Sequence, residues 1–190
     1  MSKVAIQGNA SGTGTFTIAA PNSNTDRTLT LPDEAGTVLT SASDITQNSG
    51  PTFSVYLSAD QSISASTFTK VLLDTKVFDA ENSFDLANSK FLPSVAGYYC
   101  FNGFISTSNG ANVSRQITSF FKNGSEYTRS ADLTQTSTAF CSRAGGSVLI
   151  YLNGSTDYVE LYGYQTGSST AFLGADNRKT VLQGYLVRTA

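Results

Sequence analysis

The chain contains neither histidine nor tryptophan, and the first of these absences restricts the chemistry open to it. Histidine is the usual general base near neutral pH and the commonest zinc ligand, so sites built on it are excluded. No serine occupies the Gly-x-Ser-x-Gly elbow that presents the nucleophile of α/β-hydrolases. We therefore expect a protein that is not an enzyme.

Charged residues are scarce: they make up 14% of the chain, against about 25% in typical soluble domains. Serine, threonine, asparagine and glycine take their place. The net charge is −2 and lysine and arginine form few clusters, so electrostatic binding of nucleic acid is not expected. A polar surface with so little charge suits a protein that binds neutral ligands outside a cell.

Long apolar runs are also missing. No segment approaches the ~20 apolar residues that span a membrane, and residues 1–8 are too short and too polar for a signal peptide. We therefore expect synthesis in a cytoplasm and no membrane insertion. The two cysteines, Cys100 and Cys141, are then expected to be reduced thiols, with Cys100 packed as a small apolar side chain.

Acidic side chains are the remaining candidates for catalysis, because glycan-cleaving enzymes use a pair of carboxylates. None of them lies in an apolar, cleft-like stretch of sequence, so we interpret them as surface groups and turn caps. The residues concerned are Asp74, Asp79, Glu81, Asp85, Asp132, Asp157, Glu160 and Asp176. We expect no catalytic residue, no cofactor and no metal.

Short runs of β-branched and aromatic residues, separated by Asn-Gly, Gly-Ser and Ser-Asn clusters, predict an all-β fold. Asn123-Gly124 and Asn153-Gly154 supply the positive φ angles of tight hairpins. The expected strands are 53–58, 68–73, 97–106, 113–122, 126–130, 146–152, 157–165 and 180–188.

Residues 1–50 have a different composition and form a separate predicted segment. They are rich in serine, threonine, glycine and asparagine and contain few large apolar residues. Such a segment buries too little surface to fold alone. We expect it to become ordered only against partner chains, while residues 51–190 form the folded head.

The most specific spacing in the chain lies in the run FLPSVAGYYCFNGF, which spans residues 91–104. Its key positions, continued backward along the chain, are Phe101, Tyr99, Gly97, Phe91, Phe84, Asp79 and Leu73. This spacing resembles the globular head of complement component one, subcomponent q, a trimeric jelly roll of the tumour necrosis factor superfamily. Weaker matches at 53–57, 152–161 and 183–187 extend the resemblance over residues 51–190.

The resemblance carries expectations for individual positions. The family has aromatic residues where this chain has Leu73 and Gly103, and Phe104 is expected to replace the second ring from the other face. Asp79 matches a family Asp or Asn, for which we expect a role in a turn. Relatives of the complement head bind calcium, so a calcium site in the loops that hold Asp132 and Asp176 stays open.

A second resemblance concerns residues 14–40. The segments 14–18, 28–33 and 36–40, read as GTFTI, TLTLPD and GTVLT, are similar to a motif of bacteriophage tail-fibre shafts, which are intertwined homotrimers. The two resemblances together imply a jelly-roll β-sandwich head with an extended N-terminal β arm, assembled as a homotrimer.

Three expected strands are apolar on both faces, which supports the trimer independently of any resemblance. A sandwich strand with one solvated face should alternate apolar and polar residues. In 98–105, 148–152 and 181–187 both faces carry large apolar side chains, and a second apolar face needs something to cover it. We expect a trimer interface that includes Tyr98, Phe104, Ile150 and Tyr185.

The exposed tip of the head follows from strand parity. With the C-terminus at the base, the loops 106–112, 130–142 and 166–179 fall at the far end, and both Asn-Gly turns fall at the base. Long loops on a rigid scaffold are where binding usually resides. The expected ligand contacts are Asn109, Asn112, Gln135, Gln165, Asn177 and Arg178.

These expectations combine into one functional hypothesis and one alternative. The hypothesis is a bacteriophage virion protein, a homotrimeric tail fibre or spike that mediates host attachment as a receptor-binding protein. Its residues 1–50 would bind other virion proteins, and its tip would bind a host surface glycan or protein. The alternative is a structural head-fibre or decoration protein of the virion without receptor binding.

Overall fold

The computed structural model describes residues 11–15, 17, 19, 22–26, 28, 50–107, 113–134, 143–167, 170–172 and 178–190. The chain divides into two units, Met1–Asp44 and Ile45–Ala190. In the first unit the described residues contain a bend in which the Thr25 amide donates to Ser23 Oγ at 3.1 Å. Most of the shaft-like pattern of residues 14–40 lies outside the described residues, so the arm stays a prediction.

The described residues of the second unit form strands and no helix. Each predicted strand has a counterpart, and β7 has the predicted bounds. The strands are β1 (Thr52–Tyr56), β2 (Gln61–Ile63), β3 (Thr69–Lys70), β4 (Thr75–Asp79), β5 (Phe84–Asp85), β6 (Lys90–Phe91), β7 (Gly97–Ser106), β8 (Arg115–Lys122), β9 (Ser125–Thr134), β10 (Arg143–Leu152), β11 (Val159–Gln165), β12 (Thr170–Phe172) and β13 (Val181–Thr189).

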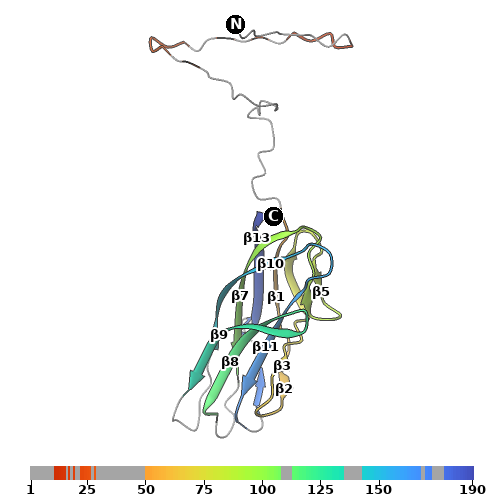
Figure 1. The fold of residues 1–190 in the computed structure, drawn as a ribbon, viewed down its shortest axis with the longest axis vertical. Helices are drawn as coiled ribbons and strands as arrows, with labels where there is room; N and C mark the ends of the chain where they lie inside the picture. Colours follow the sequence, from red (N-terminus) through yellow and green to blue (C-terminus); the bar gives the residue numbers. More distant parts are fainter. Residues whose placement is uncertain are drawn as a thin grey trace. The chain divides into compact units, whose positions relative to one another are not determined.

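The strands form two main antiparallel sheets (Figure 1). The five-stranded sheet has the order β10-β7-β13-β1-β4, so the last strand of the unit lies between β7 and β1. The six-stranded sheet has the order β5-β6-β11-β8-β9, with β3 paired to β11. The three strands predicted to be apolar on both faces, β7, β10 and β13, are therefore neighbours in one sheet.

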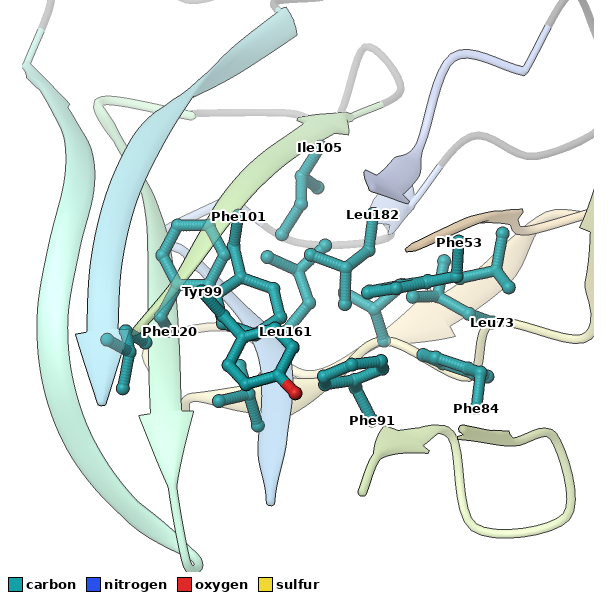
Figure 2. Close-up of a cluster of buried hydrophobic side chains, with 14 of the residues drawn as sticks. Phe53, Leu73, Phe84, Phe91, Tyr99, Phe101, Ile105, Phe120, Leu161 and Leu182 are labelled. Carbon is teal, nitrogen blue, oxygen red and sulfur yellow. The ribbon is translucent and has the colours of Figure 1, made fainter. Parts of the chain in front are cut away.

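The core between the two sheets is built from aromatic rings (Figure 2). Tyr99 and Phe101 alternate inward along β7, as the period of a strand requires. Phe91 lies among their rings: it stacks on Phe53 with ring centroids 4.5 Å apart and meets Phe101 edge-on at 5.5 Å. The spacing that resembles the complement head is thus the spacing of the core residues.

The two departures from the family pattern have simple structural explanations. Leu73 is fully buried in the same core, where an aliphatic side chain fills the position. At Gly103 an added Cβ would lie 2.8 Å from Phe120 Cζ and 2.7 Å from Leu161 Cδ1. The ring of Phe120 on the opposite sheet therefore occupies the space on the inner face, while Phe104 places its ring on the other face of the strand.

Both Asn-Gly turns lie at the end of the sandwich that also holds the C-terminus, which we call the base. The Asn123 side chain donates to Asp157 Oδ1 at 2.7 Å, and the Asn153 amide donates to Asp157 Oδ2 at 3.1 Å. The Ala190 amide donates to the Ala96 carbonyl at 3.2 Å, and Gly97 of the same strand end pairs with Leu152. Strand parity predicted this grouping.

A turn that was not predicted from the strand pattern connects β4 to β5, and Asp79 organises it. Asp79 ends β4, and its carboxylate accepts hydrogen bonds from the amides of Ser83 and Phe84, both at 3.0 Å. Lys76 forms an ion pair with the same carboxylate at 2.6 Å. Asp79 therefore has the turn role that the resemblance implied.

Candidate functional site

The outer face of the five-stranded sheet, which points away from the core, is the most unusual surface of the described residues. Its large exposed side chains include Tyr98 on β7, Leu149 and Tyr151 on β10, Tyr185 and Val187 on β13, and Phe78 on β4, which pairs with Ser54. Each of them exposes between 41% and 56% of its surface. Monomers rarely expose contiguous apolar patches of this kind, so the face is a candidate interaction surface.

Strand register orders this face into rows. Cys100 pairs with Leu149 on one side and with Tyr185 on the other, which gives one apolar row. Nearer the base, the rings of Tyr98 and Tyr151 lie 5.4 Å apart in a tilted contact. Cys100 is a free, half-buried cysteine within this surface, whereas Cys141 lies outside the described residues.

A polar row crosses the same face, and the sequence analysis did not find it. Asn102 pairs with Ser147 on β10 and with Gln183 on β13, and Gln183 pairs with Ser54 on β1. Ser147 Oγ donates to Asn102 Oδ1 at 2.5 Å, and Gln183 Nε2 donates to Ser54 Oγ at 3.0 Å. The face is therefore apolar in bands and not throughout.

Beyond the polar row, arginines of the same chain cover the aromatic residues. The Arg143 guanidinium lies 4.4 Å from the centroid of Phe104, and the Arg178 guanidinium lies 5.2 Å from that of Tyr56. Such cation–π contacts shield a ring face from water. The apolar character of the face is thus concentrated between the polar row and the base.

Among the residues expected at a trimer interface, Tyr98 and Tyr185 lie exposed on this face and Phe104 is half-buried. The expectation that Ile150 lies at the interface was wrong. This residue points into the core with 1% exposure, because β10 places Leu149 and Tyr151 on the outer face and Ile150 between them on the inner one. Leu149 and Tyr151 are therefore the interface candidates on that strand.

The end of the sandwich opposite the base, which we call the tip, gathers the strand ends that flank the long loops. Ser106 pairs with Arg143, and Arg115 pairs with Thr134. Four of the expected ligand contacts, Asn109, Asn112, Gln135 and Asn177, lie outside the described residues. Their contact role stays a prediction.

The other two tip residues do not match their expected surroundings. Gln165 belongs to β11, points inward and is fully buried, so it is not a surface contact. Within the part of the chain that the structure describes, neither polar atom of its side-chain amide has a hydrogen-bond partner. Arg178 is exposed with a φ of 53°, but its guanidinium rests on Tyr56 as described above.

On the outer face of the six-stranded sheet, aromatic rings contact one another and an arginine side chain. Phe121 and Tyr162 stack with ring centroids 3.8 Å apart, and Arg129 lies 5.5 Å from the ring of Phe68. Arg129 also pairs with Glu126 at 2.8 Å and with Asp132 at 3.1 Å. Because these rings and charged groups contact one another, this face presents less apolar surface without a partner than the outer face of the five-stranded sheet.

Several carboxylates of the described residues take part in hydrogen bonds and ion pairs. Asp132 accepts hydrogen bonds from Arg115, which lowers the pKa of its carboxyl group, and Arg129 contributes to the same effect. The Asn123 amide and Lys122 lower the pKa of Asp157. Glu160 pairs with Lys70 at 2.5 Å, and Asp74 accepts from the Ser58 amide at 2.9 Å. These pairings give the four carboxylates positioning roles.

Burial acts in the opposite direction on a core tyrosine. It raises the pKa of Tyr99 to about 12, and the Tyr99 hydroxyl donates to the Val95 carbonyl at 2.7 Å. Within the described ranges, no group of three or more potential metal-ligating side chains is found. No helix in the same part of the chain is long and apolar enough to cross a membrane.

Comparison with known proteins gives similarity of fold. No family model matches the sequence, and no curated protein matches it. The globular domain of zebrafish complement 1qA matches with a TM-score of 0.52 and 19% identity, covering 74% of this chain and 99% of that one. Murine APRIL matches with a TM-score of 0.51 and 11% identity, covering 72% and 97%.

The Eiger TNF of S. frugiperda matches with a TM-score of 0.53 and 8% identity, covering 74% of this chain and 95% of that one. At these identities the similarity concerns the fold. It agrees with the two antiparallel sheets and with the aromatic core built on the 91–104 run. The head of this chain therefore has the jelly-roll fold of the complement 1q and tumour necrosis factor-like domains.

Proposed function

We propose that this chain is the subunit of a homotrimeric bacteriophage fibre or spike whose head attaches the virion to a host cell. The observation that carries the proposal is the outer face of the five-stranded sheet. Its exposed residues Tyr98, Leu149, Tyr151 and Tyr185 would be left in water by a monomer. Burial of such side chains stabilises an assembly by roughly 25 cal/mol per Å² of apolar surface.

A trimer is the assembly that best uses this surface. The sheet carries its apolar band between the polar row and the base, while the six-stranded sheet has covered its own outer face. Three copies that meet through their five-stranded sheets would bury the band and leave the six-stranded sheets outward. The tip then points away from the base in all three copies, which suits a binding head.

The attachment role rests on the tip and on residues 1–50. The strand ends at Ser106, Arg115, Thr134 and Arg143 frame loops on a rigid scaffold, and such loops are common binding sites. Residues 1–50 would join the trimer to other virion proteins. The ion-paired carboxylates of the described residues favour binding over glycan cleavage.

Light scattering and cell adsorption test the proposal together. The purified protein should have the mass of three chains, and the labelled trimer should adsorb to cells of at least one strain in a bacterial panel. A variant with alanine at Asn109, Asn112 and Asn177 should stay trimeric and lose adsorption, with the exposed Glu81→Ala as the control. A trimer that enters the particle but binds no cell would favour the structural alternative, and a stable monomer would contradict the proposal.

A further inference from the structure

The polar row on the outer face has unused hydrogen-bonding capacity. Asn102 Oδ1 accepts from Ser147, while the Asn102 amide nitrogen donates no bond within the described residues. Gln183 Nε2 donates to Ser54, and the Gln183 carbonyl oxygen accepts none within the same residues. A free donor and a free acceptor therefore lie on paired positions of β7 and β13.

The neighbours of these two side chains are apolar. One register step toward the base lie Leu149, Cys100 and Tyr185. On the other side of the row, Phe104 pairs with Val181. An amide surrounded in this way loses access to water when the face is covered, and a buried amide without a partner is costly. Whatever covers the face must supply one acceptor and one donor at this level.

We propose that the cover is a second copy of this chain and that the row forms a ring of amides in the trimer. The Asn102 nitrogen of one copy donates to the Gln183 oxygen of the next copy, and three copies close the ring. This inference rests on the proposed trimer and adds what sets its number and register. Asn102 and Gln183 are specificity-determining residues of the assembly.

Symmetry and charge favour a second copy over another partner. In a cyclic assembly each chain offers one surface to one neighbour and a different surface to the other. Asn102 on β7 and Gln183 on β13 supply those two surfaces with equal numbers of donors and acceptors. Neither the polar row nor the adjacent apolar row contains an ionised side chain, so nothing at this level of the face selects a charged partner.

A single polar layer in an apolar interface is a known means of fixing oligomer number. One buried asparagine in a coiled coil specifies register and oligomer state at a cost in stability, because mismatched arrangements leave the amide unpaired. The row acts here in the same way. Without it, the apolar band could slide or recruit a different number of copies.

Leucine substitutions test the ring. Light scattering of the wild-type chain should give one mass, that of a trimer. Asn102→Leu and Gln183→Leu should still associate, because the face becomes wholly apolar, but they should give several masses. Ser147→Ala is the matched control: it changes the same row, leaves both free amide groups and should keep one mass.

A second variant covers the case in which the leucine variants aggregate. Gln183→Glu places like charges in the ring, so its trimer should dissociate at a protein concentration at least about tenfold higher near pH 7 than below pH 4, where the carboxyl group is protonated. A trimeric wild type whose leucine variants keep a single mass and whose Gln183→Glu variant shows no pH effect would overturn the ring alone. A monomeric wild type would overturn the proposed function.

Discussion

Replacement of Asp79 by alanine should destabilise the head, because it removes a buried carboxylate that organises a turn. The Asp79 carboxylate is 1% exposed, forms an ion pair with Lys76, and accepts two backbone hydrogen bonds. The donors are the amides of Ser83 and Phe84, both in buried residues. Alanine leaves both amides without an acceptor, and the turn between β4 and β5 loses its organising group.

The size of the effect follows from the two orphaned amides. Each buried donor left unsatisfied costs about 1–3 kcal/mol. Water can reach a turn at the margin of the sandwich, so we take the lower half of that range and expect a loss of about 2–4 kcal/mol. The Lys76 ion pair adds less, because the lysine side chain is 29% exposed and such pairs contribute about 0–1 kcal/mol.

Urea unfolding followed by tyrosine fluorescence measures this loss at one fixed protein concentration, since an assembly makes stability concentration-dependent. Asp79→Asn keeps one acceptor oxygen and should lose about half as much free energy. Glu81→Ala lies two positions away on an exposed side chain and should change stability by less than about 0.5 kcal/mol. Equal stabilities of Asp79→Ala and Glu81→Ala would refute the reasoning from buried donors.

Three further predictions concern groups in the core, the base and the outer face. Tyr99→Phe should lower the unfolding free energy by about 1 kcal/mol and leave native tyrosinate absorbance at about pH 11 unchanged, because burial keeps the Tyr99 pKa at about 12; a fall in absorbance would contradict this. The lowered pKa of Asp157 gives stability that is present above about pH 4 and lost as the pH falls through the folded-state pKa, so the gap in urea midpoint between wild type and Asp157→Asn should shrink in acid. A constant gap would argue against it. In a Cys141→Ser background, Cys100 should react slowly with an alkylating reagent in the assembled protein and rapidly after unfolding, and rapid reaction of the native assembly would place the outer face in solvent.

The sandwich could be predicted because its strands follow a period of two. Along β7, Tyr99 and Phe101 alternate with Tyr98 and Cys100, and the two sets point to opposite faces. Gly124 and Gly154 have φ angles of 78° and 70°, so the tight turns were readable from the Asn-Gly pairs. The same regularity allowed the base and the tip to be assigned by counting strands.

What sequence could not provide was the phase of individual strands. β10 begins with Arg143 and contains two successive glycines, which give no apolar alternation to count. In the second half of the strand, the inward residues Val148, Ile150 and Leu152 alternate with the equally apolar outward residues Leu149 and Tyr151. The alternation does not show which set faces the core, and Ile150 was assigned to the wrong face. Only the pairing of Ile150 with Tyr99 on β7 decides the phase.

Side-chain contacts between strands that are distant in the sequence could not be predicted either. The polar row joins Ser54, Asn102, Ser147 and Gln183 from four strands, and each of them is a single polar residue in its own segment. Likewise Gln165 ends a strand at a polar stretch, which is typical of a loop, yet it points into the sandwich. Strand order and register, not local composition, determine these positions.

The central place of β13 has a consequence for synthesis. β1 and β7 both pair with β13, the final strand of the unit, so each has an unpaired edge until Val181–Thr189 has left the ribosome. Unpaired edges readily add strands from other chains, and nascent chains on one message lie close together. β1 and β7 contain no charged side chain that would repel a neighbouring strand during this interval. A chain that stops before Val181 would keep both edges open permanently and would be prone to aggregate.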